Sequence, residues 1–360
     1  DLMRVLQLID SLETGGAERM AVNYANSLVP YIDKSYLCCT RTEGPLKKIL
    51  ENEVGYLFLK RKYTLDIKAV QRLKNFVIRH EIQVVHAHGT SFFFATLLRK
   101  LYSPIVVIWH NHSFSAHTLS FKQLFLLCYC APYFKAILCV NYQLENFCKN
   151  TLKHTSVFHV KNFVISPGEI DNTTGLYAGK RGKRIVCVAN LRPEKNHGLL
   201  LDAFSKVQEQ IPEANLHLFG ASSDDIYAKS ILEIAAYDIP QVHYHGVHEN
   251  IAAILSQFDI GTLSSDSEGL PLALLEYGMA GLPVVVTDVG HCCEVIENNG
   301  SCVKPGNARA FADAIINYLN NLDLAKATGS AFQRQILANY GTDVILPQVV
   351  KIYGESLKKL

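Results

Sequence analysis

The sequence lacks any run of about 20 uninterrupted apolar residues, the length that a membrane-spanning helix requires. The nearest candidate, residues 121–140, is interrupted by Lys122, Pro132 and Lys135, and we expect a helix followed by a strand there. The N-terminal segment turns polar too early for a secretory signal peptide. Apolar residues at 49% and charged residues at 19% are typical of a globular protein and exclude a disordered one. The 360 residues are enough for two domains, each with its own core.

The ten cysteines lack the regular framework that disulfide-rich secreted domains show. Most lie inside apolar runs, which is typical of buried, reduced thiols in a cytoplasmic protein. Cys292, Cys293 and Cys302 lie near His291, but their spacing matches no zinc-binding pattern. We therefore expect reduced thiols, no metal site and a cytoplasmic location.

Charge is distributed unevenly along the chain. Residues 1–165 carry 20 Lys and Arg against 11 Asp and Glu, a balance of +9, and the remainder carries 15 against 22, a balance of −7. Seven of the basic residues fall between positions 60 and 79. A basic first half indicates an anionic partner, either a lipid surface or a phosphorylated acceptor. A solvated helix face explains the basic segment equally well.

Strand and helix signals alternate along the chain, which predicts an α/β protein with parallel sheets covered on both faces. In the first half we expect strands at 4–9, 35–40, 83–87, 105–109 and 136–141. In the second half we expect strands at 184–189, 215–219, 242–244, 260–263 and 283–287. A polar, glycine-rich passage without periodicity, 162–183, separates the halves and predicts a linker.

Two glycines, Gly15 and Gly16, lie between the end of the first strand and the start of a helix. The backbone can approach a ligand closely at such a place because glycine has no Cβ. A simple tight turn explains the pair about as well. The chain has no Gly-x-Gly-x-x-Gly dinucleotide fingerprint at this point.

Histidines cluster where two strands of the first half end. Ligands of parallel sheets bind beyond the carboxyl ends of the strands, so an imidazole there can meet a substrate. A single histidine is nevertheless more often a structural residue. The best placed is His110, directly after an apolar strand, and the others are His86, His88 and His112.

The stretch 264–288 combines a polar loop, a helix and a strand. Glu268 and Glu276 are eight positions apart, which on one helix would rotate them by roughly 80°, so they would not point at one atom. If Glu268 lies in the loop and Pro271 is the first helical residue, both carboxylates can line one cavity. The free amides at the helix start would face that cavity and bind an anion. An ordinary connection with a solvated glutamate is an equal alternative.

Two cations, Arg192 and Lys195, follow the first strand of the second half. Cations at a strand end suit a pyrophosphate, and lysine acts there as a point charge.

With these motifs in view, the chain resembles the retaining glycosyltransferases of family 4, also called group 1. The resemblance rests on Glu268-x7-Glu276 with a Gly-Leu-Pro turn between, on the Gly-Gly-Ala-Glu-Arg string at 15–19, on Asn162, on 193–195, and on Gly290-x-x-x-Glu294. It implies the GT-B fold, with two Rossmann-like, doubly wound parallel-sheet domains facing a central cleft. The implied divisions are an acceptor-binding domain at 1–165, a nucleotide-sugar-binding domain at 166–343, and a C-terminal helix at 344–360 that crosses back to the first domain.

The same resemblance implies roles for individual residues. His110 would lie at the reacting centre, with His112 as its rival because the Trp-His-Asn-His-Ser string allows a shifted alignment, and Glu268 would contact the donor sugar. The residues implied to bind the donor are Gly15, Gly16, Arg192, Lys195, Val247, Gly269, Leu270, Pro271 and Glu276. One position departs from the family pattern, since Asn190 occupies the place of a frequent arginine, for which Arg192 could substitute.

The implied activity is transfer of a sugar from a nucleotide diphosphate sugar, a UDP-sugar, to a glycan or lipid-linked acceptor at the cytoplasmic face of a membrane. No cofactor, no metal and no nucleic acid are expected. Two alternatives are a nucleotide-sugar epimerase on the same fold and a non-catalytic nucleotide-sugar-binding protein.

Overall fold

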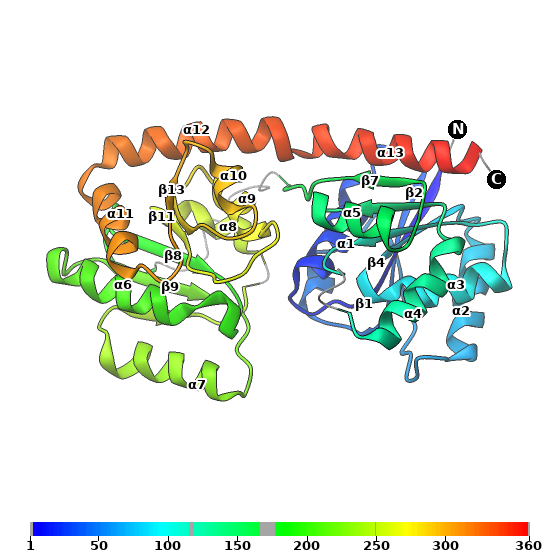
Figure 1. Ribbon diagram of the computed structural model, residues 1–360, viewed down its shortest axis with the longest axis horizontal. Helices are drawn as coiled ribbons and strands as arrows, with labels where there is room; N and C mark the ends of the chain where they lie inside the picture. The colour runs from blue at the N-terminus through cyan, green and yellow to red at the C-terminus, as the bar shows by residue number, and fades with distance from the viewer. Residues whose placement is uncertain (1–2, 115–118, 166–176, 249, 359–360) are drawn as a thin grey trace. The chain divides into compact units, whose positions relative to one another are not determined.

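The computed structural model describes residues 3–114, 119–165, 177–248 and 250–358. The chain divides into two compact units, which are Asp1–Ile165 with Thr342–Leu360, and Ser166–Gly341. Figure 1 shows a parallel sheet flanked by helices in each unit. Of the predicted linker, residues 166–176 lie outside the described residues.

Unit 1 is built on a seven-stranded parallel sheet in the order β3-β2-β1-β4-β5-β6-β7. Its strands are β1 (Arg4–Ser11), β2 (Lys34–Thr42), β3 (Gly55–Phe58), β4 (Val84–His88), β5 (Val106–Asn111), β6 (Ala136–Cys139) and β7 (Val157–His159). Its first helices are α1 (Gly16–Ser27), α2 (Ile67–Arg79), α3 (Phe92–Leu101), α4 (Phe121–Cys130) and α5 (Tyr142–Asn150). The central strands are buried along their whole length because helices cover both faces.

Unit 2 repeats this plan with six parallel strands in the order β10-β9-β8-β11-β12-β13. The strands are β8 (Arg184–Val188), β9 (Asn215–Phe219), β10 (Val242–Tyr244), β11 (Ile260–Leu263), β12 (Val284–Thr287) and β13 (Ser301–Val303). The helices are α6 (His197–Gln210), α7 (Ile226–Glu233), α8 (Ile251–Ile254), α9 (Leu272–Met279), α10 (Cys292–Ile296), α11 (Ala308–Asn320) and α12 (Leu322–Tyr340). In both units ligands are expected beyond the carboxyl ends of the strands.

Alternation along the strands of unit 1 places successive side chains on opposite faces of the sheet. Val107 and Trp109 of β5 point into the largest hydrophobic core together with Val85 and Ala87 of β4. The intervening residues of these strands, which include His110, lie on the opposite face of the sheet. Histidines are therefore buried on the face away from that core.

The last helix, α13 (Thr342–Lys358), packs on unit 1, where Figure 1 draws it in red along the sheet. It begins at Thr342, two residues before the expected position, and Gly341 in extended conformation separates it from α12. Tyr353 of this helix is fully buried. No helix in the described part of the chain is long and apolar enough to cross a membrane.

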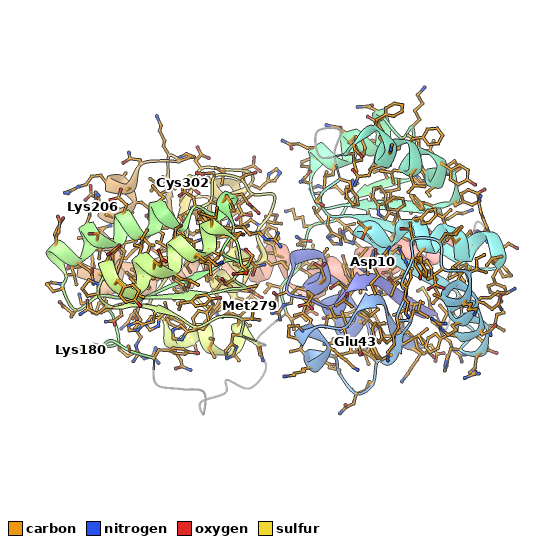
Figure 2. All side chains as sticks on the ribbon, turned by 90° about the horizontal axis from the view of Figure 1, so that it is seen from below. Asp10, Glu43, Lys180, Lys206, Met279 and Cys302 are labelled. Carbon is orange, nitrogen blue, oxygen red and sulfur yellow. A yellow bond between two sulfur atoms is a disulfide. The ribbon has the colours of Figure 1, made fainter. Side chains whose placement is uncertain are left out.

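The expectation of reduced thiols is wrong for two cysteines. Cys293 on α10 and Cys302 on β13 form a disulfide across nine positions of sequence, and Figure 2 labels Cys302 on the surface of unit 2. The other eight cysteines are free, and all of them except Cys128 are buried. No sequence pattern indicated the pairing, because α10 and β13 have only five and three residues and their spatial contact could not be predicted.

Candidate active site

Two loops of unit 2 meet at the carboxyl ends of β8 and β11, which are neighbours in the sheet. Lys195 ends a short 3-10 turn (Pro193–Lys195) and forms an ion pair with Glu268, in which Nζ lies 2.7 Å from Oε1. Ser265 Oγ donates to the same carboxylate oxygen at 2.6 Å. The side chain of Glu268 is 6% exposed and that of Lys195 is 23% exposed. The structure thus brings two predicted site residues into contact.

Further hydrogen bonds hold these two loops together. Ser264 Oγ donates to the carbonyl of Lys195 at 3.1 Å, and the amide of Asp266 donates to the carbonyl of Glu194 at 2.9 Å. The side-chain amide of Asn196 contacts both carboxylate oxygens of Asp266, at 2.9 and 3.0 Å. The ion pair is therefore positioned by the backbone of both loops.

Helix α9 begins directly after the loop that carries Glu268. It starts at Leu272 with Pro271 as the N-cap, so the expectation that Pro271 is the first helical residue is wrong by one position. Pro271 has an extended backbone, and its carbonyl accepts from the amide of Leu274 at 3.1 Å. The first amides of a helix have no intrahelical acceptor and carry partial positive charge. Glu276 lies on this helix and is partly buried.

The loop after β12 supports the backbone around Glu268. Gly290 has a φ of +54°, and a Cβ there would collide with the carbonyl oxygen of Glu268. The amide of His291 donates to the carbonyl of Gly269 at 3.1 Å. His291 Nδ1 in turn lies 2.7 Å from Glu294 Oε2. The Gly290-x-x-x-Glu294 motif therefore shapes the loop that holds Glu268.

Sequence reasoning missed Tyr277, which holds α9 on the sheet. Its buried hydroxyl accepts from the amide of Val188 at 2.7 Å and donates to the carbonyl of Thr262 at 3.3 Å. Its ring lies against Gly261, where a Cβ would collide with it. The hydroxyl could have been predicted to form a hydrogen bond, because buried tyrosines usually do. The apolar residues around Tyr277 in the sequence indicated only that it lies in the core.

The remaining predicted donor residues of unit 2 lie on the loops beside this pair. Asn190 Oδ1 accepts from the amide of Ala221 at 2.8 Å, so Asn190 ties the loop after β8 to the loop after β9. Arg192 is exposed on the same loop as Lys195. Val247 is 40% exposed and follows a glycine of positive φ.

The glycine pair of unit 1 lies at the start of α1, as its sequence position indicates. Gly15 is the N-cap, and Gly16 is the first helical residue. A Cβ on Gly15 would collide with the carboxylate of Glu18, whereas a Cβ on Gly16 would meet nothing within 4 Å. The backbone at Gly16 therefore has open space beside a helix start.

Two pairs of histidines lie on one face of the unit 1 sheet, and His88 is registered beside His110. His86 Nε2 lies 3.2 Å from His110 Nδ1, and His88 Nδ1 lies 3.0 Å from His112 Nε2. Three of the rings are fully buried, including His110, whereas His112 is partly exposed. Of the two histidines predicted for the reacting centre, His112 is thus the one that is not fully buried in this structure.

Burial keeps all four imidazoles neutral. It lowers the pKa of His86, His88 and His110 well below the ordinary value of 6.5, and neighbouring imidazoles lower it further. It lowers the pKa of His112 to about 3. At neutral pH each ring therefore has one N–H donor and one acceptor nitrogen.

Two groups in the described part of the chain offer ligand atoms within 4.8 Å of one another, namely His86 with His88 and His110, and Asp288 with Cys293 and Cys302. Neutral imidazoles are good zinc ligands. In this structure, however, His86 Nε2 is engaged with His110 Nδ1, both ring nitrogens of His88 are engaged with His112 and Gln7, and the two sulfurs are bonded to each other. That the protein works without a metal stays a prediction.

The fold and these loops match a known family. Residues 182–321 match the family model of group 1 glycosyl transferases, and residues 14–160 match that of glycosyltransferase family 4. Together the two matches cover most of both units. The chain belongs to this family, and it is a glycosyltransferase.

Two relatives with assigned activities match part of the chain. N-acetyl-alpha-D-glucosaminyl L-malate synthase of Bacillus anthracis is 25% identical over 178 residues, which are 49% of this chain and 46% of that enzyme. N,N'-diacetylbacillosaminyl-diphospho-undecaprenol alpha-1,3-N-acetylgalactosaminyltransferase of Campylobacter jejuni is 32% identical over 126 residues, 33% of this chain and 32% of that enzyme. The chain therefore matches less than half the length of these two relatives.

Solved structures show the same architecture over the whole chain. HepE of Anabaena, in complex with UDP and glucose, has a TM-score of 0.78 at 18% identity and covers 99% of this chain and 100% of its own. TarM has a TM-score of 0.74 at 14% identity and covers 98% of this chain and 99% of its own. The fold is the GT-B fold.

Proposed function

We propose that this protein is a retaining glycosyltransferase that moves a sugar from a UDP-sugar to a glycan or lipid-linked acceptor in the synthesis of cell-surface polysaccharide or glycoconjugate. The observation that carries the proposal is the Lys195–Glu268 ion pair beside the start of α9. A cation, a carboxylate and a helix N-terminus in one loop cluster suit a sugar diphosphate. Solved relatives that contain UDP or UDP-glucose support this choice of donor.

Donor binding replaces the ion pair by contacts to the ligand. Lys195 turns to the diphosphate, and the freed carboxylate of Glu268 accepts from sugar hydroxyls. Glu276 binds the ribose hydroxyls, and the amides of Gly269 and Leu270 contact sugar and phosphate. In the complex Lys195 thereby pairs with the anionic diphosphate, and Glu268 accepts hydrogen bonds from the sugar.

The roles of these residues in the transfer reaction follow from the charges that develop as the bond between sugar and diphosphate breaks. As the bond to the diphosphate breaks, the sugar becomes oxocarbenium-like and negative charge grows on the leaving phosphate. Lys195, Arg192 and the first amides of α9 stabilise that charge, so the scheme requires no metal ion. Retention follows when the acceptor attacks from the face that the phosphate leaves, with the leaving phosphate taking the acceptor's proton.

A lipid-linked acceptor is supported by the surface of unit 1. Helix α4 exposes Phe121 at 84% and Phe125 at 70%, and Figure 1 shows α2, α3 and α4 along one side of the unit. Helix α2 belongs to the basic segment 60–79. Aromatic side chains and lysines together suit an anionic membrane surface. Binding to anionic vesicles should then fall steeply with salt, and salt-insensitive binding would remove the membrane from the proposal.

The test is an assay of UDP release and product formation with a panel of UDP-sugars, glycan acceptors and lipid-linked acceptors, with and without EDTA. We expect Glu268→Gln and Lys195→Met to lower turnover by about 100-fold. Lys206→Met, on the solvent-facing side of α6, is the matched control. The anomeric configuration of the product tests retention, and loss of activity in EDTA would contradict the metal-free scheme.

Two other outcomes would replace the proposal. Epimerisation of a UDP-sugar without any acceptor would identify a nucleotide-sugar epimerase. Donor binding without turnover, with cellular function surviving Glu268→Gln, would identify a non-catalytic binding protein.

A further inference from the structure

Gln7 lies at the inner end of a hydrogen-bonded chain of two histidines, His88 and His112. It is on β1, registered beside His86 of β4, and its side chain is fully buried. Its Oε1 lies 2.8 Å from His88 Nε2. Its amide therefore contacts the inner end of the histidine cluster, whereas the partly exposed His112 forms the outer end.

We propose that Gln7 is a positioning residue that fixes the tautomers of these histidines, so that His112 presents Nδ1 as a hydrogen-bond acceptor to a substrate hydroxyl. The nature of that hydroxyl, on the donor sugar or on the acceptor, rests on the proposed function. The assignment of the tautomers depends only on the hydrogen-bond geometry.

The first chain runs from Gln7 to the surface. An amide oxygen only accepts, so His88 Nε2 carries the hydrogen. A neutral imidazole has one N–H, which leaves His88 Nδ1 as an acceptor. His112 Nε2, 3.0 Å away, is then the donor, and His112 Nδ1 keeps its lone pair. Among the described residues, no hydrogen bond to that Nδ1 is formed.

The second chain starts at Tyr353, whose Oη lies 2.6 Å from His86 Nδ1. Among the described residues, Tyr353 Oη forms no other hydrogen bond, and Gln7 Nε2 forms none. A buried phenol hydrogen needs an acceptor, so Tyr353 donates to His86 Nδ1. His86 Nε2 then carries the hydrogen and donates to His110 Nδ1.

The hydrogen of His110 then lies on Nε2, which is buried without a hydrogen-bond partner in the described part of the chain. In this structure Gln7 Oε1 faces His88 Nε2, and the order of the first chain follows from that orientation. Reversing the Gln7 amide would invert every bond in the first chain and place the hydrogen of His112 on Nδ1.

One buried amide thus decides whether Nδ1 of His112 accepts or donates a hydrogen bond. An acceptor can bind a sugar hydroxyl through the hydroxyl hydrogen, which orients the oxygen for reaction. A donor at the same place would bind the oxygen lone pair instead.

The direct test is nitrogen-15 NMR of the full-length protein labelled at histidine, at neutral pH and without substrate. Protonated and unprotonated ring nitrogens give separate resonances. We expect His86, His88, His110 and His112 to carry hydrogen on Nε2. Hydrogen on Nδ1 of His88 or His112 would overturn the proposal, as would stoichiometric zinc in the purified protein, since a metal would take these nitrogens.

Two variants separate positioning from packing. Gln7→Met keeps the length and removes the polar atoms, and we expect mixed tautomers at His112 with kcat lowered by about 10-fold or more and an unchanged KM for the donor. Gln7→Glu restores an acceptor for His88 and should restore the His112 tautomer and part of kcat. An unchanged His112 tautomer in folded Gln7→Met refutes the role. If that variant does not fold, the wild-type spectrum alone tests the tautomer of His112. If no sugar transfer is found, the spectra still test the role of Gln7, because they need no substrate.

Discussion

Lys195 Nζ lies 2.7 Å from Glu268 Oε1, and this pair joins the loop after β8 to the loop after β11. Glu268 is almost fully buried, so its charge has lost most of its hydration. Such a charge is stable only when close partners replace water, and here Lys195 and Ser265 do so. The same contacts position both groups for a ligand. A phosphate can pair with the lysine, and a hydroxyl can donate to the carboxylate.

Lys195→Met should lower the free energy of unfolding of unit 2. Among the described residues, the carboxylate of Glu268 would keep only the Ser265 hydroxyl as a partner. We expect a loss of about 1–2 kcal/mol after allowance for the partial exposure of the lysine. Urea unfolding at neutral pH measures it. Lys206→Met is the control, since Lys206, labelled in Figure 2, pairs with Asp202 on the surface of α6 and should cost less than about 0.5 kcal/mol. Equal losses in the two variants would contradict the role of burial.

Gly290→Ala should destabilise the protein more than replacing another glycine of positive φ does, because it also disturbs the loop that carries Glu268. The added Cβ would collide with the carbonyl oxygen of Glu268, so the loop must move. Gly306→Ala is the matched control, because Gly306 has a φ of +77° but open space around its Cβ position. We expect about 1 kcal/mol of destabilisation in the control and more in Gly290→Ala. Only Gly290→Ala should also weaken UDP binding, as calorimetry can measure, and equal UDP affinities would argue against the loop's role.

The α/β class and the parallel sheets could be predicted because the central strands are apolar and buried on both faces. The three strands that were missed are β3, β7 and β13, which have three or four residues. Such short strands carry no periodicity that separates them from loops. The start of α9 was misplaced by one residue because proline is tolerated both at the N-cap and in the first turn.

The site could be predicted where its residues are close in sequence or follow strands of the same sheet. Lys195 and Glu268 satisfy the second condition, and their loops meet because β8 and β11 are neighbours. Tyr353 and His86 do not, since 267 positions separate them and only the packing of α13 on unit 1 brings them together. Gln7 likewise gains its role from the strand register of β1 and β4, which no local pattern contains.

Tyr277→Phe should lower the stability of unit 2 without creating a cavity. The change removes only the hydroxyl and leaves the amide of Val188 and the carbonyl of Thr262 without that partner. We expect a loss of about 1–3 kcal/mol in urea unfolding, because buried polar groups without partners are costly. Tyr237→Phe, at a side chain that is 86% exposed, should change the value by less than about 0.5 kcal/mol. A loss no larger than in Tyr237→Phe would show that the hydroxyl does not hold α9 on the sheet.

The buried histidines should make unit 1 less stable as the pH falls below neutral. Burial lowers the pKa of His86, His88 and His110 well below 6.5 and that of His112 to about 3. Below about pH 6.5 the unfolded chain takes up protons on these rings and the folded chain does not, so stability present above 6.5 is lost between 6.5 and about 3.

Each such histidine adds a slope of at most about 1.4 kcal/mol per pH unit. Urea unfolding between about pH 7 and pH 5 measures the slope in a range where few carboxylates titrate. His112→Asn removes one of these rings and should give a shallower slope than the wild type. His110→Asn should reduce the slope by a similar amount, because both rings stay neutral in the folded protein over this range. A wild-type stability that does not change over this range would mean that the four rings titrate in the folded protein, and hence that water reaches them.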